Sequence, residues 1–440
     1  MELKKVSLWL FFCLFLILPE YFALEFSASL PLLTASRFII ILLLVNLFLM
    51  GRIRIRIDRS YLTFFLILLI VNIYHISTNS SEAIKAVFSL VIEETVLYIA
   101  LKNLITSKSM LIKGIDIMVK TSGVISLLAI FEAYTKINIF YFLTTTSRDM
   151  LQASYDRLGV LRAEASFGHP VYFAVYLCCL LPFSLYFFEN TKKRIYAIVA
   201  ILNITAVFCS GTRGGIVTLV VLLLWSVFSK RDKVKFKYLK AVLGGLPILI
   251  VIFILYPQVF NYASSLFISI LASLGFSSTD ILNFGGNASG ITSRLAQFTG
   301  LTWAKEHGAL IMGFGPGAHK HGLISFVNVI SGAWNVTTSI DIGYLSNILL
   351  YGIVGALGYA ILYVSVIRKV LKYSNEKQTD NLFNAFKYFY IAYFVSLVSS
   401  VGQTATFFVF TFLMLIYIDL DRRGHVDEKQ IDSRVIRYRT

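Results

Sequence analysis

The sequence predicts an all-α polytopic membrane protein with about twelve transmembrane helices. Of its 440 residues, 57% are hydrophobic and only 15% are charged, which is far from the composition of a soluble globular chain. Apolar runs of about 17 to 25 residues recur from end to end, and such a run crosses a hydrocarbon core of about 30 Å as a helix. Basic residues lie in short clusters between these runs, as the positive-inside rule expects of cytoplasmic loops.

The first apolar run follows Lys4 and Lys5. It lacks a small-x-small cleavage site and further spans follow it, so we expect an uncleaved first helix rather than a signal peptide. The expected spans are 6–24, 36–50, 60–76, 83–101, 119–139, 169–188, 195–211, 214–229, 239–256, 341–366, 384–401 and 404–420. They divide the chain into helices 1 to 9 within 1–256, a large loop at 257–340, helices 10 to 12 within 341–420, and a tail at 421–440.

An N-terminus in the cytoplasm places the basic clusters on the cytoplasmic side. These clusters lie at 51–59, 102–120, 189–194, 230–240 and 368–387 and in the tail after Asp419. With Lys4 and Lys5 they hold most of the 40 Lys and Arg residues, so both termini are expected in the cytoplasm. A net charge of +16 that is distributed in this way argues against nucleic acid as a partner.

Two long loops then lie on the outer face, at about 140–168 and 257–340. Within the second, the apolar stretch 259–276 would reverse the orientation of all later spans if it crossed the membrane. We therefore expect a helix that lies in the interface or packs on the bundle. The stretch 293–307 has the pattern of an amphipathic helix, and the tail mixes charges without apolar periodicity, which is typical of a mobile end.

Five arginines break the positive-inside pattern, because this topology places them on the outer face. An unpaired arginine near a bilayer costs from about 2.5 kcal/mol upward, so it normally faces protein, water or a partner. Singly, each is explained by a position in the interface or by a salt bridge, such as Arg162 with Glu164. As a set they indicate an anionic partner. The five are Arg148, Arg157, Arg162, Arg213 and Arg294.

Three of these arginines come from separate segments and can converge on one diphosphate, whose oxygens match the guanidinium fork. Arg162 precedes the sixth span, and Arg294 opens the amphipathic stretch of the large loop. Arg213 stands in a turn that also contains Gly211 and Gly214. Glycines allow a ligand to approach the backbone, and the helix that begins there offers N–H groups to an anion.

Asp341, at the start of the tenth span, is a second kind of signal. A carboxylate there is either a helix cap, worth about 1 kcal/mol, or a base that accepts the proton of a sugar hydroxyl. His169, just before Pro170, is likewise either a structural hydrogen-bonding group or a site residue. Gly352 and Gly355 favour close packing between helices.

No metal and no other cofactor is expected. His319 and His321 lie near the 313–317 glycines, but two histidines at this spacing without a nearby carboxylate are a weak metal signal. The four cysteines lie in apolar runs without the spacing of a zinc site or a redox pair, so they are expected to be small core residues. They are Cys13, Cys178, Cys179 and Cys209.

Four segments, in this order, resemble the O-antigen polymerase and O-antigen ligase superfamily of bacterial membrane proteins. They are 162–170, the turn around Arg213, Ser293-Arg294 with Trp303 and the 313–317 glycines, and the stretch from Asp341 to Gly355. The resemblance implies a GT-C-like, metal-independent, inverting glycosyltransferase of the bacterial inner membrane. Its substrate would be an undecaprenyl-pyrophosphate-linked oligosaccharide on the outer face.

Ligases of this superfamily are similar around Asp341 but have a histidine there, followed by a polar residue where this chain has Ile342. Aspartate at this position favours a polymerase, which moves the growing glycan from its lipid pyrophosphate to a hydroxyl of another lipid-linked repeat unit. Arg213 and Arg294, with Arg162 beside them, would hold the leaving pyrophosphate, and Asp341 would orient or deprotonate the acceptor. The expected substrate-binding residues are Arg162, His169, Gly211, Gly214, Gly315 and Tyr344.

Two alternatives stay open. A ligase would transfer the glycan to lipid A-core or another acceptor. A transporter or flippase for the same lipid-linked sugars would place charges at mid-membrane and have related halves. The sequence shows no internal repeat, and the candidate charges are Lys85, Glu93, Glu94, Glu132 and Lys136. The other expected partners are the lipid bilayer and a chain-length regulator protein, and the glycan is left open among O-antigen, capsule and exopolysaccharide.

Overall fold

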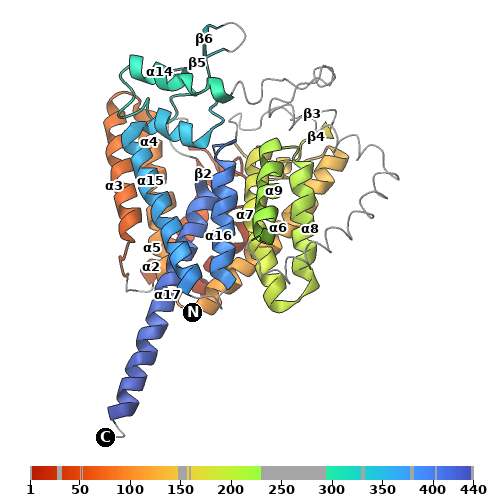
Figure 1. The fold of residues 1–440 in the computed structure, drawn as a ribbon, viewed down its shortest axis with the longest axis vertical. Coiled ribbons are helices and arrows are strands. Elements are labelled where there is room, and N and C mark those ends of the chain that lie inside the picture. Colours follow the sequence, from red (N-terminus) through yellow and green to blue (C-terminus); the bar gives the residue numbers. More distant parts are fainter. Residues whose placement is uncertain are drawn as a thin grey trace.

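The structure is a computed structural model that describes residues 2–26, 32–49, 51, 53–146, 156–157, 160–228, 294–328, 332–376, 381–401 and 404–437. Most of these residues form one bundle of helices (Figure 1). The helices are α1 (Glu2–Leu14), α2 (Ala35–Leu49), α3 (Arg59–Tyr74), η1 (His75–Ser77), α4 (Ser80–Phe88), η2 (Ser89–Val96), α5 (Leu97–Leu104), α6 (Lys108–Thr135), η3 (Ile139–Leu143), α7 (Pro170–Thr191), α8 (Arg194–Cys209), α9 (Arg213–Phe228), α14 (Thr299–Glu306), α15 (Gly343–Glu376), α16 (Asn381–Ser396) and α17 (Thr404–Arg437).

Strands are few and short. Each pairs with its neighbour as an antiparallel ribbon. The pairs are β1 (Ala23–Leu24) with β2 (Leu33–Thr34), β3 (Asp156–Arg157) with β4 (Val160–Leu161), and β5 (Ser325–Val327) with β6 (Trp334–Val336). The predicted all-α class is therefore confirmed for the described part of the chain.

Five helical segments of the described chain are long and apolar enough to cross a membrane, which supports the predicted membrane class. Three more apolar helices are shorter: Ala35–Leu49, Arg194–Cys209 and Arg213–Ser226. The predicted total of about twelve spans goes beyond these, and the span at 239–256 and the apolar stretch 259–276 lie outside the described residues. The five long segments are Arg59–Ser77, Lys108–Thr135, Pro170–Thr191, Gly343–Asn375 and Thr404–Arg423.

Two predicted helix boundaries are wrong. The first helix was expected at 6–24, but α1 ends at Leu14 and the chain then turns, because Pro19 has no N–H to continue a helix. The stretch 102–120 was expected to be a cytoplasmic connection, but α6 already begins at Lys108. Ser107 caps this helix by accepting a hydrogen bond from the backbone N–H of Met110 at 3.2 Å.

Two helices depart from the simple rod that a hydropathy pattern predicts, and a third is longer than predicted. The fourth span is continuous from α4 to α5 but contains a π-helical segment, η2. Helix α15 is kinked at Gly352, whose φ of 68° and ψ of −174° are not helical. Helix α17 forms the centre of the bundle, where residues 406–418 are all buried, and it continues through the predicted tail to Arg437.

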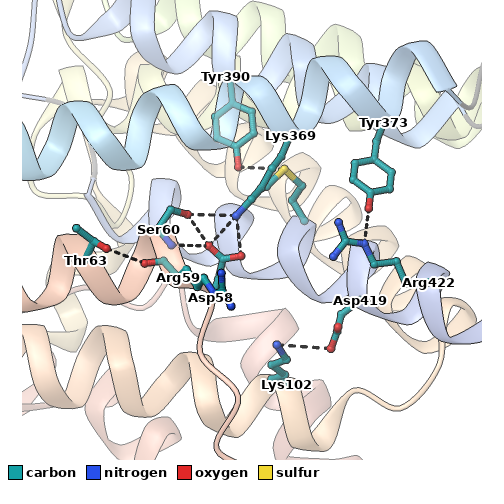
Figure 2. A network of polar contacts seen from close by, with 11 residues as sticks. Asp58, Arg59, Ser60, Thr63, Lys102, Lys369, Tyr373, Tyr390, Asp419 and Arg422 are labelled. Carbon is teal, nitrogen blue, oxygen red and sulfur yellow. Dashed lines mark hydrogen bonds and ion pairs between the residues drawn. The ribbon is translucent and has the colours of Figure 1, made fainter.

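One end of the bundle contains the start of α1 and the place where α17 leaves the bundle, and the opposite end carries α14, β5 and β6 (Figure 1). Figure 2 shows a polar network that joins α3, α5, α15 and α17. Lys369 Nζ contacts both carboxylate oxygens of Asp58 at 2.6 Å. Lys102 pairs with Asp419 at 3.5 Å. These contacts join α15 to the start of α3, and α5 to α17, in addition to apolar packing.

Candidate functional site

The 210–215 turn, which follows α8 and includes the first residues of α9, contains Arg213 and packs tightly against residues 397–401, which follow α16. The Ser210 and Thr212 hydroxyls lie 2.9 Å apart, and Gly211 has a φ of 58°, which favours glycine. A Cβ at Gly214 would lie 2.2 Å from Ser399 Oγ. Glycine at 214 therefore lets this turn approach the 397–401 connection, and the predicted ligand approach there stays a prediction.

Arg162 lies beside this turn. Its Nε donates a hydrogen bond to the carbonyl oxygen of Ser210 at 3.0 Å. The backbone N–H of Ala163 donates to the carbonyl oxygen of Cys209 at 3.1 Å. Two of the three arginines predicted to act together are thus carried by segments that are bonded to each other.

The segment that carries Arg162 is held in place by Glu132 of α6, which is 3% exposed. Glu132 Oε2 accepts from the N–H of Ala165 at 2.8 Å, and Oε1 accepts from the N–H of Glu164 at 3.3 Å. Asn138 donates both to Glu132 Oε1 and to the carbonyl oxygen of Ala165. From the sequence, Glu132 was considered only as a charge that a transporter could use. Its role in holding the backbone of residues 164–165 was not predicted.

Glu164 is buried on the same segment, where it accepts a hydrogen bond from the hydroxyl of Tyr141. Burial raises the pKa of the Glu164 carboxyl above its ordinary value, whereas the Tyr141 bond and the charge of Arg162 lower it. His169 caps α7, because its Nδ1 accepts from the N–H of Val171 at 3.1 Å. Burial, and then the charge of Arg162, lowers the pKa of His169 to about 4. His169 therefore has a structural role, and a substrate contact stays a prediction.

Asp341 and Arg294, both predicted to be catalytic, form an ion pair at 3.7 Å. Their side chains are 44% and 35% exposed, so the pair contributes about 1 kcal/mol or less. The backbone N–H of Asp341 donates to Oε1 of Gln297 at 3.0 Å. Gln297, which is 7% exposed, was not singled out in the sequence. Polar ligands can compete for both charged groups of this weak pair.

The start of α15 packs against the same 397–401 connection as the Arg213 turn does. The N–H of Gly343 donates to the carbonyl oxygen of Leu397 at 2.8 Å, and a Cβ there would lie 2.8 Å from the carbonyl oxygen of Ser400. Tyr344 donates its hydroxyl hydrogen to the carbonyl oxygen of Phe394 at 3.0 Å. The 397–401 connection, which carries none of the predicted site residues, thus joins the two halves of the predicted site.

Gly315 has a different environment. The 313–317 segment packs between η1 and the kink of α15, and a Cβ at Gly315 would lie 3.0 Å from the ring of His75. His75 Nε2 lies 2.9 Å from the carbonyl oxygen of Met312, and Asn79 donates to the carbonyl oxygen of Pro316 at 3.3 Å. Close packing explains why a glycine stands at position 315. The predicted contact of Gly315 with substrate stays a prediction.

The other predicted features have simpler outcomes. Arg148 lies outside the described residues, and Arg157 lies in β3. Cys178 and Cys179 are buried and Cys13 and Cys209 partly buried, as expected of core residues. The described residues contain no group of three or more His, Cys, Asp or Glu arranged to hold a metal. Comparison of the sequence with protein-family models and with curated proteins found no match.

Proposed function

We propose that the chain is a metal-independent glycosyltransferase of the bacterial inner membrane, a polymerase of lipid-linked oligosaccharide repeat units. The observation that carries the proposal is the convergence around the 397–401 connection. The Arg213 turn and the start of α15 both contact this connection. Arg162 is hydrogen-bonded to the Arg213 turn, and Asp341, which pairs with Arg294, directly precedes α15. This set combines arginines, which can bind a pyrophosphate, with a carboxylate, which can accept the proton of a hydroxyl.

The polar end of the bundle supports an assignment of sides. Lys102, Lys108 and Arg422 make polar contacts with or from the 419–422 stretch of α17, and Lys369 of α15 pairs with Asp58. Helix α17 leaves the bundle at the end opposite α14 and β5 (Figure 1). The positive-inside rule assigns that end to the cytoplasm. The convergent arginines then belong to the outer face, where lipid-linked repeat units are polymerised.

In the proposed reaction, an acceptor hydroxyl attacks the anomeric carbon of the sugar on the lipid pyrophosphate. The bond from that carbon to the pyrophosphate oxygen breaks as the new glycosidic bond forms, which inverts the anomeric centre. The acceptor proton passes to the Asp341 carboxylate. Arg213, Arg294 and Arg162 bind the departing pyrophosphate, whose growing negative charge they stabilise.

The polymerase is favoured over a transporter by the partners of Glu132 and Glu93, two of the five charges that a transporter could use. Glu132 accepts hydrogen bonds from the backbone of the 164–165 segment, and Glu93 pairs with Arg37 at 2.5 Å. Both have partners in the described structure that a transported ion would have to displace. Polymerase is favoured over ligase by Asp341, which stands where the resemblance gives a ligase histidine.

The test uses a strain deleted for the chain and complemented with variants. Arg213→Ala and Asp341→Ala are expected to reduce polymer formation roughly 100-fold or more, since each removes a group that acts on the transition state. Arg213→Lys should restore little, because lysine lacks the planar fork. Arg423→Ala is the control, because Arg423 is 45% exposed and pairs with Asp419 at 2.7 Å. Normal amounts of long polymer with either alanine variant would refute the mechanism.

The deletion strain itself separates the two family activities. A single repeat unit still attached to its final acceptor supports a polymerase. Accumulation of full-length lipid-linked chains supports a ligase instead. Purified protein supplied with lipid-linked repeat units should lengthen the glycan, which a transporter would not do.

A further inference from the structure

A cavity of about 360 Å³ lies among the turn after α1, α2, η2, the start of α7 and the start of α17. This volume is at the lower end of small-molecule pockets and corresponds to roughly ten water molecules. Its walls mix aromatic rings, such as those of Phe15, Phe167 and Phe408, with carboxyl and hydroxyl groups. The principal polar groups belong to Glu20, Glu93, Glu94, Ser166, Tyr172 and Thr404.

The cavity shares two walls with the candidate site. Ser166 lies on the segment that carries Arg162. Glu132 holds this segment by accepting a hydrogen bond from the N–H of Ala165. Val401 lies at the end of the connection against which Gly214 packs. The cavity therefore lies beside the segment that carries Arg162 and beside the connection that the Arg213 turn contacts.

Two polar atoms of the cavity residues are buried and have no hydrogen-bond partner within the described structure. They are Oε2 of Glu94 and Oγ of Ser166, a residue that is only 4% exposed. A buried polar atom without a partner costs about 1–3 kcal/mol. Glu93, in contrast, accepts from Nε of Arg37 at 2.5 Å and from the Ser89 hydroxyl at 2.6 Å. Ser166 and Glu94, which both line the cavity, thus each carry a polar atom that lacks a hydrogen-bond partner within the described structure.

The helix that supplies the two adjacent glutamates has an unusual geometry. Glu93 and Glu94 lie in η2, the π-helical segment, in which the Thr95 hydroxyl donates to the carbonyl oxygen of Leu90 at 3.0 Å. Both glutamates line the cavity. Single π-helical turns are rare and are frequent at functional sites.

We infer that this cavity binds the sugar that is attached to the pyrophosphate, an inference that rests on the proposed function. Among the described residues that line the cavity, three carry carboxyl groups and none a basic side chain, so they offer no cation to a phosphate, which is directed to the arginines. Carboxylates accept hydrogen bonds from sugar hydroxyls, and hydroxyl side chains both donate and accept. The aromatic rings offer apolar faces to the C–H groups of a sugar ring, and the volume exceeds what a bare cation needs.

The test compares two lipids as ligands of the purified full chain in detergent. One is undecaprenyl pyrophosphate without sugar, and the other is the lipid-linked repeat unit extracted from a strain that lacks this chain. Glu94→Gln is expected to weaken binding of the glycolipid about two- to tenfold, the loss of one hydrogen bond. Ser166→Ala should weaken it about two- to tenfold. Neither variant should change binding of the sugar-free lipid.

Matched controls are Glu306→Gln, an exposed carboxylate on α14, and Ser184→Ala, a buried hydroxyl that bonds to its own helix at 3.4 Å. Arg213→Ala should weaken binding of both lipids. If Glu94→Gln and Ser166→Ala leave glycolipid binding unchanged, or weaken both lipids equally, the cavity is not the sugar site, while dependence on Arg213 still supports the proposed function. A chain that binds neither lipid overturns both proposals.

Discussion

Lowering the pH from 6.5 to 4 is expected to destabilise the chain through His169. This histidine caps α7, because its Nδ1 accepts a hydrogen bond from the N–H of Val171 at 3.1 Å. A proton on Nδ1 removes that acceptor. It also places a positive charge at the positive end of the helix dipole and near Arg162. The folded chain therefore resists protonation of this ring.

The magnitude follows from the pKa. Burial, and then the charge of Arg162, lowers the pKa of His169 from 6.5 to about 4. Each pKa unit corresponds to about 1.36 kcal/mol, so the free energy of unfolding should fall by at most about 3 kcal/mol. Below pH 6.5 the unfolded histidine takes up a proton and the folded one does not. Stability is thus fully present above pH 6.5, is lost as the pH falls to about 4, and then levels off.

The assay is thermal unfolding of the purified protein in detergent, followed by tryptophan fluorescence between pH 7 and 3.5. The wild type is compared with His169→Asn, because asparagine caps a helix well and does not titrate. Carboxylates titrate in the same range, so the informative quantity is the difference between the two Tm curves. That difference should shift in favour of His169→Asn as the pH falls. Parallel curves would show that His169 is not held neutral by its surroundings.

Three further substitutions test the packing of the site and of the polar end. Glu132→Gln places an amide group against backbone N–H donors, so it should lower the free energy of unfolding by about 1–3 kcal/mol and reduce polymer formation at equal protein level. Gly214→Ala should cost about 1–3 kcal/mol, since its Cβ would lie 2.2 Å from Ser399 Oγ. Adding Ser399→Ala should recover part of the loss in thermal unfolding, and no recovery would contradict the contact. Burial raises the pKa of Asp58, but hydrogen bonds from Lys369 and Ser60 outweigh this and lower it. The stability from this pair is therefore present at neutral pH and lost as the pH falls through the folded pKa. Lys369→Met should cost about 1 kcal/mol at pH 7 because the pair is partly exposed, and the cost should vanish in an Asp58→Asn background.

The helices that could be predicted from the sequence are those whose ends coincide with the ends of an apolar run. The predicted spans 60–76 and 195–211 lie within a few residues of α3 and α8. The ends at Leu14 and Lys108 were not predicted, because a proline and a serine cap decide them inside or beside the apolar run. Hydropathy measures burial in a membrane, whereas a helix end is set by single backbone hydrogen bonds.

The candidate site was predictable only in part for a related reason. Arg213 was recognisable because glycines surround it in a polar turn within an apolar chain. Ser399 and Gln297 gave no such signal, since each acts through a neighbour that is remote in the sequence. Glu132 was recognisable as a buried charge, but its role depends on the backbone of residues 164–165, about thirty positions later.

The ion pair between Arg294 and Asp341 links binding to chemistry in the proposed reaction. While the site is without substrate, each group neutralises the other at 3.7 Å, and the weak pair is easily opened. A pyrophosphate offers Arg294 more oxygens and more charge than one carboxylate does. In the proposed reaction, Arg294 would turn to the pyrophosphate and leave the Asp341 carboxylate free to accept a hydrogen bond from the acceptor hydroxyl. Opening of the pair would thus couple binding of the leaving group to binding of the acceptor.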